Sequence, residues 1–218
     1  MTASLPILYS FRRCPYAMRA RMALTVSAQA YLHREVVLRD KPAEMISISP
    51  KATVPVLQLP DSRVIDESLE IAQWALEIND PEQWLVPQNE NFQTMMELIS
   101  LNDGQFKHNL DRYKYPSRYD ETTDPIHHRG KGHLFLSNLN DRLEGKAHLF
   151  GNRPCLADYA IFPFVRQFAN TDSDWFYAQP LINLHKWLQA HMQSGLFSYI
   201  MKKIDPWKPG VKEPQFPN

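Results

Sequence analysis

A cysteine near the start of the chain, Cys14, has the surroundings of a reactive thiol. It follows Arg12 and Arg13 and precedes Pro15, where a short apolar segment gives way to a helical pattern. Because the positive end of a helix and two guanidinium groups stabilise a thiolate, we expect the pKa of this thiol to lie below its reference value of about 8.5. A lone cysteine is more often a buried core residue. Burial of the adjacent Arg12 and Arg13 would cost free energy, however, so this position is expected to be open to solvent. Cys14 is therefore the candidate nucleophile.

The tetrapeptide Cys14-Pro15-Tyr16-Ala17 has the form of a dithiol redox motif that lacks its second cysteine. Because an internal disulfide cannot form, a redox cycle would use a mixed disulfide between Cys14 and an external thiol, which a second molecule of that thiol resolves. The other cysteine of the chain, Cys155, lies far away in the sequence. The two cysteines indicate neither a disulfide scaffold nor a metal-ligand spacing, so we expect no metal.

The elements that must position Cys14 alternate between strand and helix over the first 79 residues. Apolar and β-branched runs predict strands, and small or apolar residues at helical spacing predict helices. We expect Arg19 and Arg21 to lie on the outer face of the first helix. The predicted order is β-α-β-α-β-β-α, with strands at 5–10, 31–38, 54–59 and 64–65 and helices at 14–27, from 42 onward and at 67–78.

The composition changes after a connecting segment at 79–89, because no alternating strand pattern follows it. An all-helical domain is predicted over 90–204. Residues 205–218 hold four prolines and are expected to form an extended tail. The predicted fold is thus an α/β domain at 1–79 followed by an all-α domain, with helices near 90–112, 126–144, 155–170, 180–192 and 195–203.

The overall charge favours neither nucleic acid nor a cationic partner, since 24 basic residues balance 24 acidic ones. The first residues show no cationic region followed by an apolar stretch, and no later segment approaches the ~18 consecutive apolar residues of a membrane span. We expect a soluble, unexported protein in a reducing compartment, the cytoplasm, with no nucleic-acid or membrane partner.

Several motifs, in order along nearly the whole chain, resemble the cytosolic glutathione transferases that carry a cysteine at the active site, the omega class being the nearest type. The resemblance implies a thioredoxin-like first domain, an all-helical second domain, glutathione as co-substrate and a homodimer. The motifs are Phe11-Arg12-Arg13-Cys14-Pro15-Tyr16-Ala17 with Arg19, Asp40-Lys41-Pro42, Val54-Pro55-Val56, Asp66-Glu67-Ser68, Gly151 and Leu156-Ala157-Asp158.

The resemblance also implies the glutathione-binding residues. Val54-Pro55 resembles the family's cis-proline turn, where the backbone of Val54 would pair with the cysteinyl part of glutathione. Glu67 would meet the γ-glutamyl ammonium group and Ser68 its carboxylate, although the same residues could simply begin a helix. Lys41 would meet the glycyl carboxylate, although a solvated lysine explains this position as well.

The second domain departs from the family pattern at one position. Members of the family carry Ser or Thr three residues before the aspartate that corresponds to Asp158, and this chain has Cys155 there. Because sulfur is a weak acceptor, we expect a poorer helix cap. We assign both residues to folding.

Three functions remain open at this stage. The first is glutathione-dependent thiol transfer or reduction with Cys14 as nucleophile. The second is conjugation of glutathione to an electrophile, assisted by a hydroxyl of Ser10 or Tyr9. The third is a non-enzymatic interaction module on the same fold. A cysteine at the helix start favours the first, and the sequence does not identify the second substrate.

Overall fold

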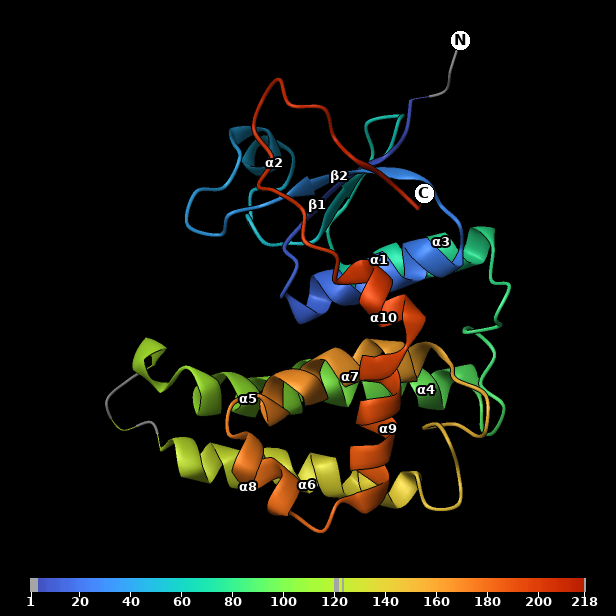
Figure 1. Ribbon diagram of the computed structural model, residues 1–218, viewed down its shortest axis with the longest axis vertical. Coiled ribbons are helices and arrows are strands. Elements are labelled where there is room, and N and C mark those ends of the chain that lie inside the picture. Colours follow the sequence, from blue (N-terminus) through green and yellow to red (C-terminus); the bar gives the residue numbers. More distant parts are fainter. Residues whose placement is uncertain (1–3, 120–121, 123, 218) are drawn as a thin grey trace. The chain divides into compact units, whose positions relative to one another are not determined.

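The computed structural model describes residues 4–119, 122 and 124–217, which form two compact units. Of these described residues, those at 4–82 and 194–217 belong to one unit, and those between 83 and 193 belong to the other. Figure 1 shows a sheet with its helices in the first unit and helices in the second. The expected fold class, a thioredoxin-like domain and a helical domain, is confirmed.

The first unit contains a mixed sheet whose strand order is β4-β3-β1-β2-β5. The strands β1 and β2 run parallel, and every other neighbouring pair in this order is antiparallel. The predicted order of the first elements is confirmed, with bounds β1 (Ile7–Ser10), α1 (Pro15–Val26), β2 (Tyr31–Glu35), α2 (Ala43–Ile48), β3 (Val56–Gln58), β4 (Val64–Ile65) and α3 (Ser68–Ile78).

The proline-rich tail supplies a strand that the sequence pattern did not predict. β5 (Gln215–Phe216) pairs antiparallel with β2, so that Phe216 lies opposite Tyr31. The two aromatic rings stack with centroids 6.1 Å apart. The end of the tail therefore covers one edge of the sheet, where it provides hydrogen-bond partners that an open edge would lack.

Helices cover both faces of the sheet. α1 and α3 pack against each other on one face, and α2 lies on the other (Figure 1). Because side chains alternate along a strand, Leu8 packs with the first pair of helices, whereas its neighbour Tyr9 packs in a separate cluster with Met45 of α2. The expectation that Arg19 and Arg21 lie on an outer face is wrong, since their exposed fractions are 1% and 2%.

The predicted helices of the second half of the chain are present, with small shifts of their ends. The first of them contains a π-helical turn at Asn102–Phe106, and α8 was not expected from the sequence. Among the described residues, no helix combines the length and the apolar composition needed to span a membrane. The bounds are α4 (Phe92–Leu101), α5 (Lys107–Lys114), α6 (Pro125–Arg142), α7 (Leu156–Ala169), α8 (Ser173–Ala178) and α9 (Ile182–Gln193), while α10 (Gly195–Ile200) belongs to the first unit.

Candidate active site

Cys14 lies at the N-cap position of α1, immediately before Pro15 at the first helical position. It is partly exposed, and its thiol donates a weak hydrogen bond to the carbonyl oxygen of Val54, with Sγ and O 3.6 Å apart. The Cys14 amide donates to the Phe11 carbonyl at 3.0 Å, which closes a tight turn before the helix. The thiol therefore stands at the positive end of α1 and remains accessible, as a nucleophile must.

The loop that carries Cys14 is held from beneath by the buried side chain of Arg21. Its guanidinium donates to the Ser10 hydroxyl at 2.5 Å, to the Arg12 carbonyl at 2.8 Å and to the Phe11 carbonyl at 3.3 Å. A planar group with five N–H donors suits several acceptors at once. Arg21 thus fixes the loop from α1 itself, which explains why an arginine on this helix is buried.

Val54 and Pro55 are joined by a cis peptide bond, as the resemblance of the motif predicts. Val54 is buried, and its carbonyl oxygen accepts the hydrogen bond from the Cys14 thiol. Within the described part of the chain, no protein acceptor is found for the Val54 amide. An extended peptide could therefore pair with this amide next to the thiol.

Glu67 and Ser68 lie at the start of α3, where Glu67 is the N-cap residue and Ser68 is the first residue of the helix. The Ser68 hydroxyl accepts a hydrogen bond from the buried Arg19 of α1 at 3.3 Å. Arg19 therefore brings positive charge to a helix N-terminus, and both features favour an anion. This contribution of Arg19 was missed, because an arginine in an amphipathic helix is usually assigned to the surface.

Lys51 is a second residue that the sequence motifs did not indicate. Its ammonium nitrogen lies 2.5 Å from a Glu67 carboxylate oxygen and 3.0 Å from one of Asp66. These hydrogen bonds, that to Glu67 above all, raise the pKa of Lys51. Burial alone would raise the pKa of Asp66, but hydrogen bonds from Ser49 and Lys51 hold it below its usual value. A ligand ammonium group at Glu67 must share or displace Lys51.

Lys41 lies between the turn at residues 37–40 and α2. It is partly exposed, and no hydrogen bond or ion pair joins its ammonium group to another described residue. Among the described residues, Lys41 thus has no hydrogen-bond or ion-pair partner, in contrast to Lys51.

The two hydroxyls considered for conjugation are both buried. The Tyr9 hydroxyl accepts a hydrogen bond from Arg34 at 2.5 Å, and burial raises the pKa of Tyr9 although Arg34 opposes the shift. Ser10 is fully buried, and its hydroxyl accepts a hydrogen bond from Arg21. Both groups serve the packing of β1, since neither is exposed at the surface beside Cys14.

In the second unit, Asp158 organises the N-terminus of α7 from a fully buried position. Its carboxylate accepts hydrogen bonds from the amides of Cys155 and Leu149, each at 2.9 Å, and from the indole of Trp187 at 2.8 Å. Burial acts to raise the pKa of Asp158, but the surrounding donors lower it. Burial raises the pKa of Cys155, which makes this thiol unreactive. Both residues therefore act in folding, as the sequence predicts.

Among the described residues, the side chains that could hold a metal ion are His148, Asp158 and His191. The nearest histidine nitrogens lie 3.7 and 4.0 Å from an Asp158 oxygen. Both oxygens of that carboxylate already accept protein N–H groups, so a metal would have to displace them. The cluster is therefore explained by folding rather than by metal binding.

Two domain families match the chain. Residues 8–84 match the N-terminal domain of glutathione S-transferases, and residues 126–190 match the C-terminal domain of the same enzymes. Together the two matches span well over half of the chain and both of its compact units. No curated protein sequence matches the chain significantly.

Solved structures of low sequence identity share the fold. A glutathione transferase family member from Pseudomonas fluorescens with two glutathione bound has 17% identity and a TM-score of 0.75, over 92% of this chain and 94% of that one. A glutathione transferase Omega 3C from Trametes versicolor has 17% identity and a TM-score of 0.74, over 93% and 86%. A glutathione transferase from Phanerochaete chrysosporium in complex with oxidized glutathione has 14% identity and a TM-score of 0.77, over 90% and 94%.

Proposed function

Since the chain belongs to the glutathione S-transferase family, we propose that it is a glutathione-dependent thiol transferase or reductase in which Cys14 is the nucleophile. One observation carries the proposal: a partly exposed thiol lies at the start of α1, 3.6 Å from the backbone of the Val54-Pro55 turn. A hydroxyl at this position could stabilise the thiolate of glutathione, but only a thiol can form a disulfide with it. The omega-like character of the chain is part of this proposal.

Glutathione would lie along the residues that surround Cys14. Its cysteinyl backbone would pair with Val54 beside Pro55, and its γ-glutamyl carboxylate would meet the Ser68 hydroxyl and the first amides of α3. Glu67 would bind the ammonium group in competition with Lys51. The glycyl carboxylate would reach Lys41, whose ammonium group is open to a ligand.

The reaction consists of two exchanges of one disulfide bond. The Cys14 thiolate attacks the glutathione sulfur of a mixed disulfide, which forms a bond between Cys14 and glutathione and breaks the original sulfur–sulfur bond. The released thiolate takes up a proton. A second glutathione, as thiolate, then attacks the glutathione sulfur bound to Cys14, which yields glutathione disulfide and regenerates the Cys14 thiolate.

Known relatives support glutathione as co-substrate, because solved structures of this fold from Pseudomonas fluorescens and Phanerochaete chrysosporium contain glutathione or its oxidised form. The alternative of conjugation has less support, since the hydroxyls of Tyr9 and Ser10 are buried and bound to arginines. An interaction module without activity would not need an accessible thiol. We further propose a homodimer in the cytoplasm, which sedimentation at micromolar concentration and fractionation of cells would test.

The test of this function is a Cys14→Ser variant. It should lose thiol transfer to a glutathione mixed disulfide, while it keeps its affinity for S-methylglutathione, because other residues hold the peptide. Cys155→Ser provides the matched control and should keep the activity, since Cys155 is buried and its thiol unreactive. Unchanged turnover in the Cys14→Ser variant would exclude Cys14 as the nucleophile.

A further inference from the structure

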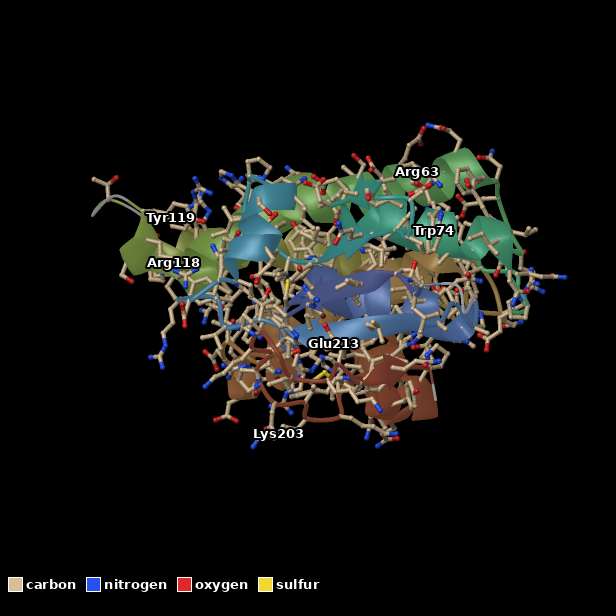
Figure 2. The ribbon with its side chains drawn as sticks, turned by 90° about the horizontal axis from the view of Figure 1, so that it is seen from above. Arg63, Trp74, Arg118, Tyr119, Lys203 and Glu213 are labelled. Atoms are coloured by element: carbon tan, nitrogen blue, oxygen red, sulfur yellow. The ribbon has the colours of Figure 1, made fainter. Side chains whose placement is uncertain are left out.

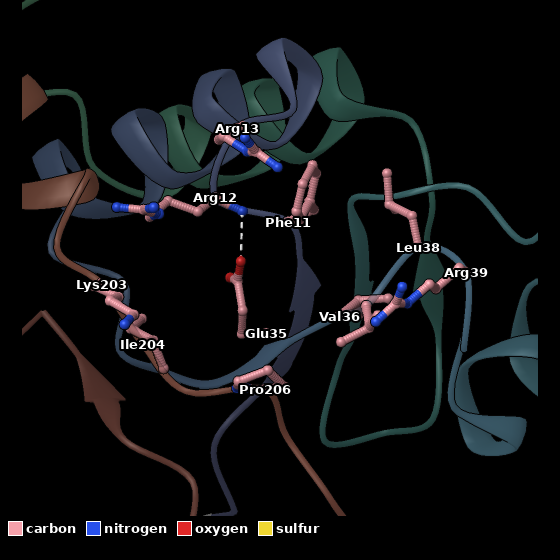
Figure 3. Close-up of a pocket in the computed structure, with 11 residues that line it drawn as sticks. Phe11, Arg12, Arg13, Glu35, Val36, Leu38, Arg39, Lys203, Ile204 and Pro206 are labelled. Carbon is pink, nitrogen blue, oxygen red and sulfur yellow. Dashed lines mark hydrogen bonds between the residues drawn. The ribbon is translucent and has the colours of Figure 1, made fainter.

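A cavity of about 670 Å³ opens in the first unit beside the loop that precedes α1. Three segments line it: that loop, the end of β2 with the chain that follows it, and the chain after α10 (Figure 3). Four cationic side chains contribute to its wall, namely Arg12, Arg13, Arg39 and Lys203. They come from all three segments, so the positive charge is a property of the folded cavity rather than of one stretch of sequence.

These four cations have no anionic protein partner among the described residues. Figure 3 shows Glu35 within the same cavity, with its carboxylate directed to the backbone of Arg12. Glu35 accepts the Arg12 amide at 2.7 Å, and its other oxygen lies 3.0 Å from Nε2 of His33. Glu35 is thus engaged by other groups, and the cavity keeps an excess of positive charge.

The rest of the wall is largely apolar. Phe11, Val36, Leu38 and Ile204 line the cavity, and the Arg13 guanidinium lies 5.6 Å from the centre of the Phe11 ring. Lys203 lies between α10 and the proline-rich tail and is exposed, and Figure 2 shows it at the edge of the view. Apolar walls combined with cations suit a small molecule that has an apolar body and an anionic group.

The cavity lies next to the apolar cluster against which the nucleophile packs. Cys14 packs against the apolar cluster that contains Val36, and Phe11 packs against the same cluster. Both Phe11 and Val36 also line the cavity. The cavity and the thiol therefore share two neighbouring side chains, Phe11 and Val36, within the first unit.

We propose that this cavity binds the second substrate of the enzyme, and that this substrate is a mixed disulfide of glutathione with a small thiol that carries a carboxylate or a similar anion on an apolar body. The proposal rests on the proposed thiol transfer and defines its substrate class. When Cys14 takes up glutathione, the anionic thiol is the leaving group. The four cations attract its anion before the exchange, and the apolar wall accommodates its body.

Two matched substrates test the charge requirement: the mixed disulfides of glutathione with 3-mercaptopropionate and with 3-mercaptopropionamide, which differ in charge but hardly in shape. Rates are divided by those of the uncatalysed exchange with glutathione. We expect kcat/KM to be about tenfold higher for the carboxylate, since two or more exposed cations each contribute a few-fold. The Arg39→Gln/Lys203→Gln variant, which leaves Arg12 and Arg13 in place, should lower this preference from about tenfold to about threefold.

A second measurement does not depend on turnover. Calorimetry of the Cys14→Ser protein should detect binding of 3-phenylpropionate but not of 3-phenyl-1-propanol. Binding of 3-phenylpropionate should weaken at high salt, and it should weaken when Arg39→Gln and Lys203→Gln are added to the Cys14→Ser protein.

Equal turnover of the two disulfides by the wild-type protein would overturn the substrate class and leave the thiol transfer intact. If neither disulfide is turned over, the proposed thiol transfer fails, and only the calorimetric measurement with 3-phenylpropionate then tests the cavity as an anion site. The absence of 3-phenylpropionate binding, or binding that the double substitution does not change, would then overturn the cavity as an anion site.

Discussion

Glu67→Gln should weaken glutathione binding by a modest factor that follows from its surroundings. The Glu67 side chain is 62% exposed and already contacts Lys51 at 2.5 Å. A shielded hydrogen bond between charged groups is worth about 1.5–3 kcal/mol, whereas an exposed ion pair is worth about 0.2–1 kcal/mol. Because solvent screens Glu67, the smaller value applies, and the dissociation constant should rise about two- to fivefold.

Lys51→Met makes the opposite prediction. Lys51 contacts both Asp66 and Glu67, so its removal leaves two carboxylates for the ammonium group of glutathione. Binding should become tighter by a factor similar to the loss in Glu67→Gln. Glu70→Gln is the matched control, since Glu70 lies in the same first turn of α3 and should not affect binding.

Calorimetry with S-methylglutathione measures these changes without interference from disulfide exchange. The salt dependence should fall in Glu67→Gln, because a charged contact is lost. If Glu67→Gln and Lys51→Met both bind with the wild-type affinity, Glu67 does not contact the ammonium group of glutathione.

Three further predictions concern the second unit and the two thiols. Asp158→Ala should lower the free energy of unfolding, measured by urea titration, by at least about 3 kcal/mol, because three buried N–H groups lose their acceptor. Thiol transfer per folded molecule should be unchanged. A variant that loses activity at unchanged stability would refute this assignment. Burial lowers the pKa of His191 to about 4, so below about pH 6.5 the unfolded chain binds a proton at this residue that the native protein does not bind. The free energy of unfolding should therefore fall by about 2 kcal/mol between pH 7 and pH 5. A His191→Asn variant whose free energy of unfolding falls equally over this range would contradict the assignment to His191. Iodoacetamide should label Cys14 much faster than the buried Cys155, and peptide mass showing equal rates would exclude a reactive Cys14.

Local patterns predicted most of the fold. Strand and helix order in the first unit follows from short apolar runs and from helical spacing, and the resemblance of Val54-Pro55 predicted the cis bond. The two-residue strand β5 escaped prediction because its pairing with β2 joins residues from opposite ends of the chain. A strand of this length has no alternating pattern that could reveal it.

Site residues that belong to a sequence motif were predicted, whereas residues whose role depends on partners distant in the sequence were missed. Cys14, Glu67 and Ser68 belong to motifs that can be found in the sequence. Arg21 and Lys51 do not, because their acceptors become neighbours only after folding. An arginine in a helix is usually exposed, and only the loop carbonyls beneath Cys14 explain why Arg21 is buried.

Disulfide formation between Cys14 and glutathione is measured most directly by the mass of the protein after incubation with oxidised glutathione. We predict one glutathione adduct per chain on the peptide that contains Cys14, removed by reduced glutathione and absent from the Cys14→Ser variant. A protein that takes up no adduct, or a Cys14→Ser variant that takes up the same one, would contradict thiol transfer through Cys14.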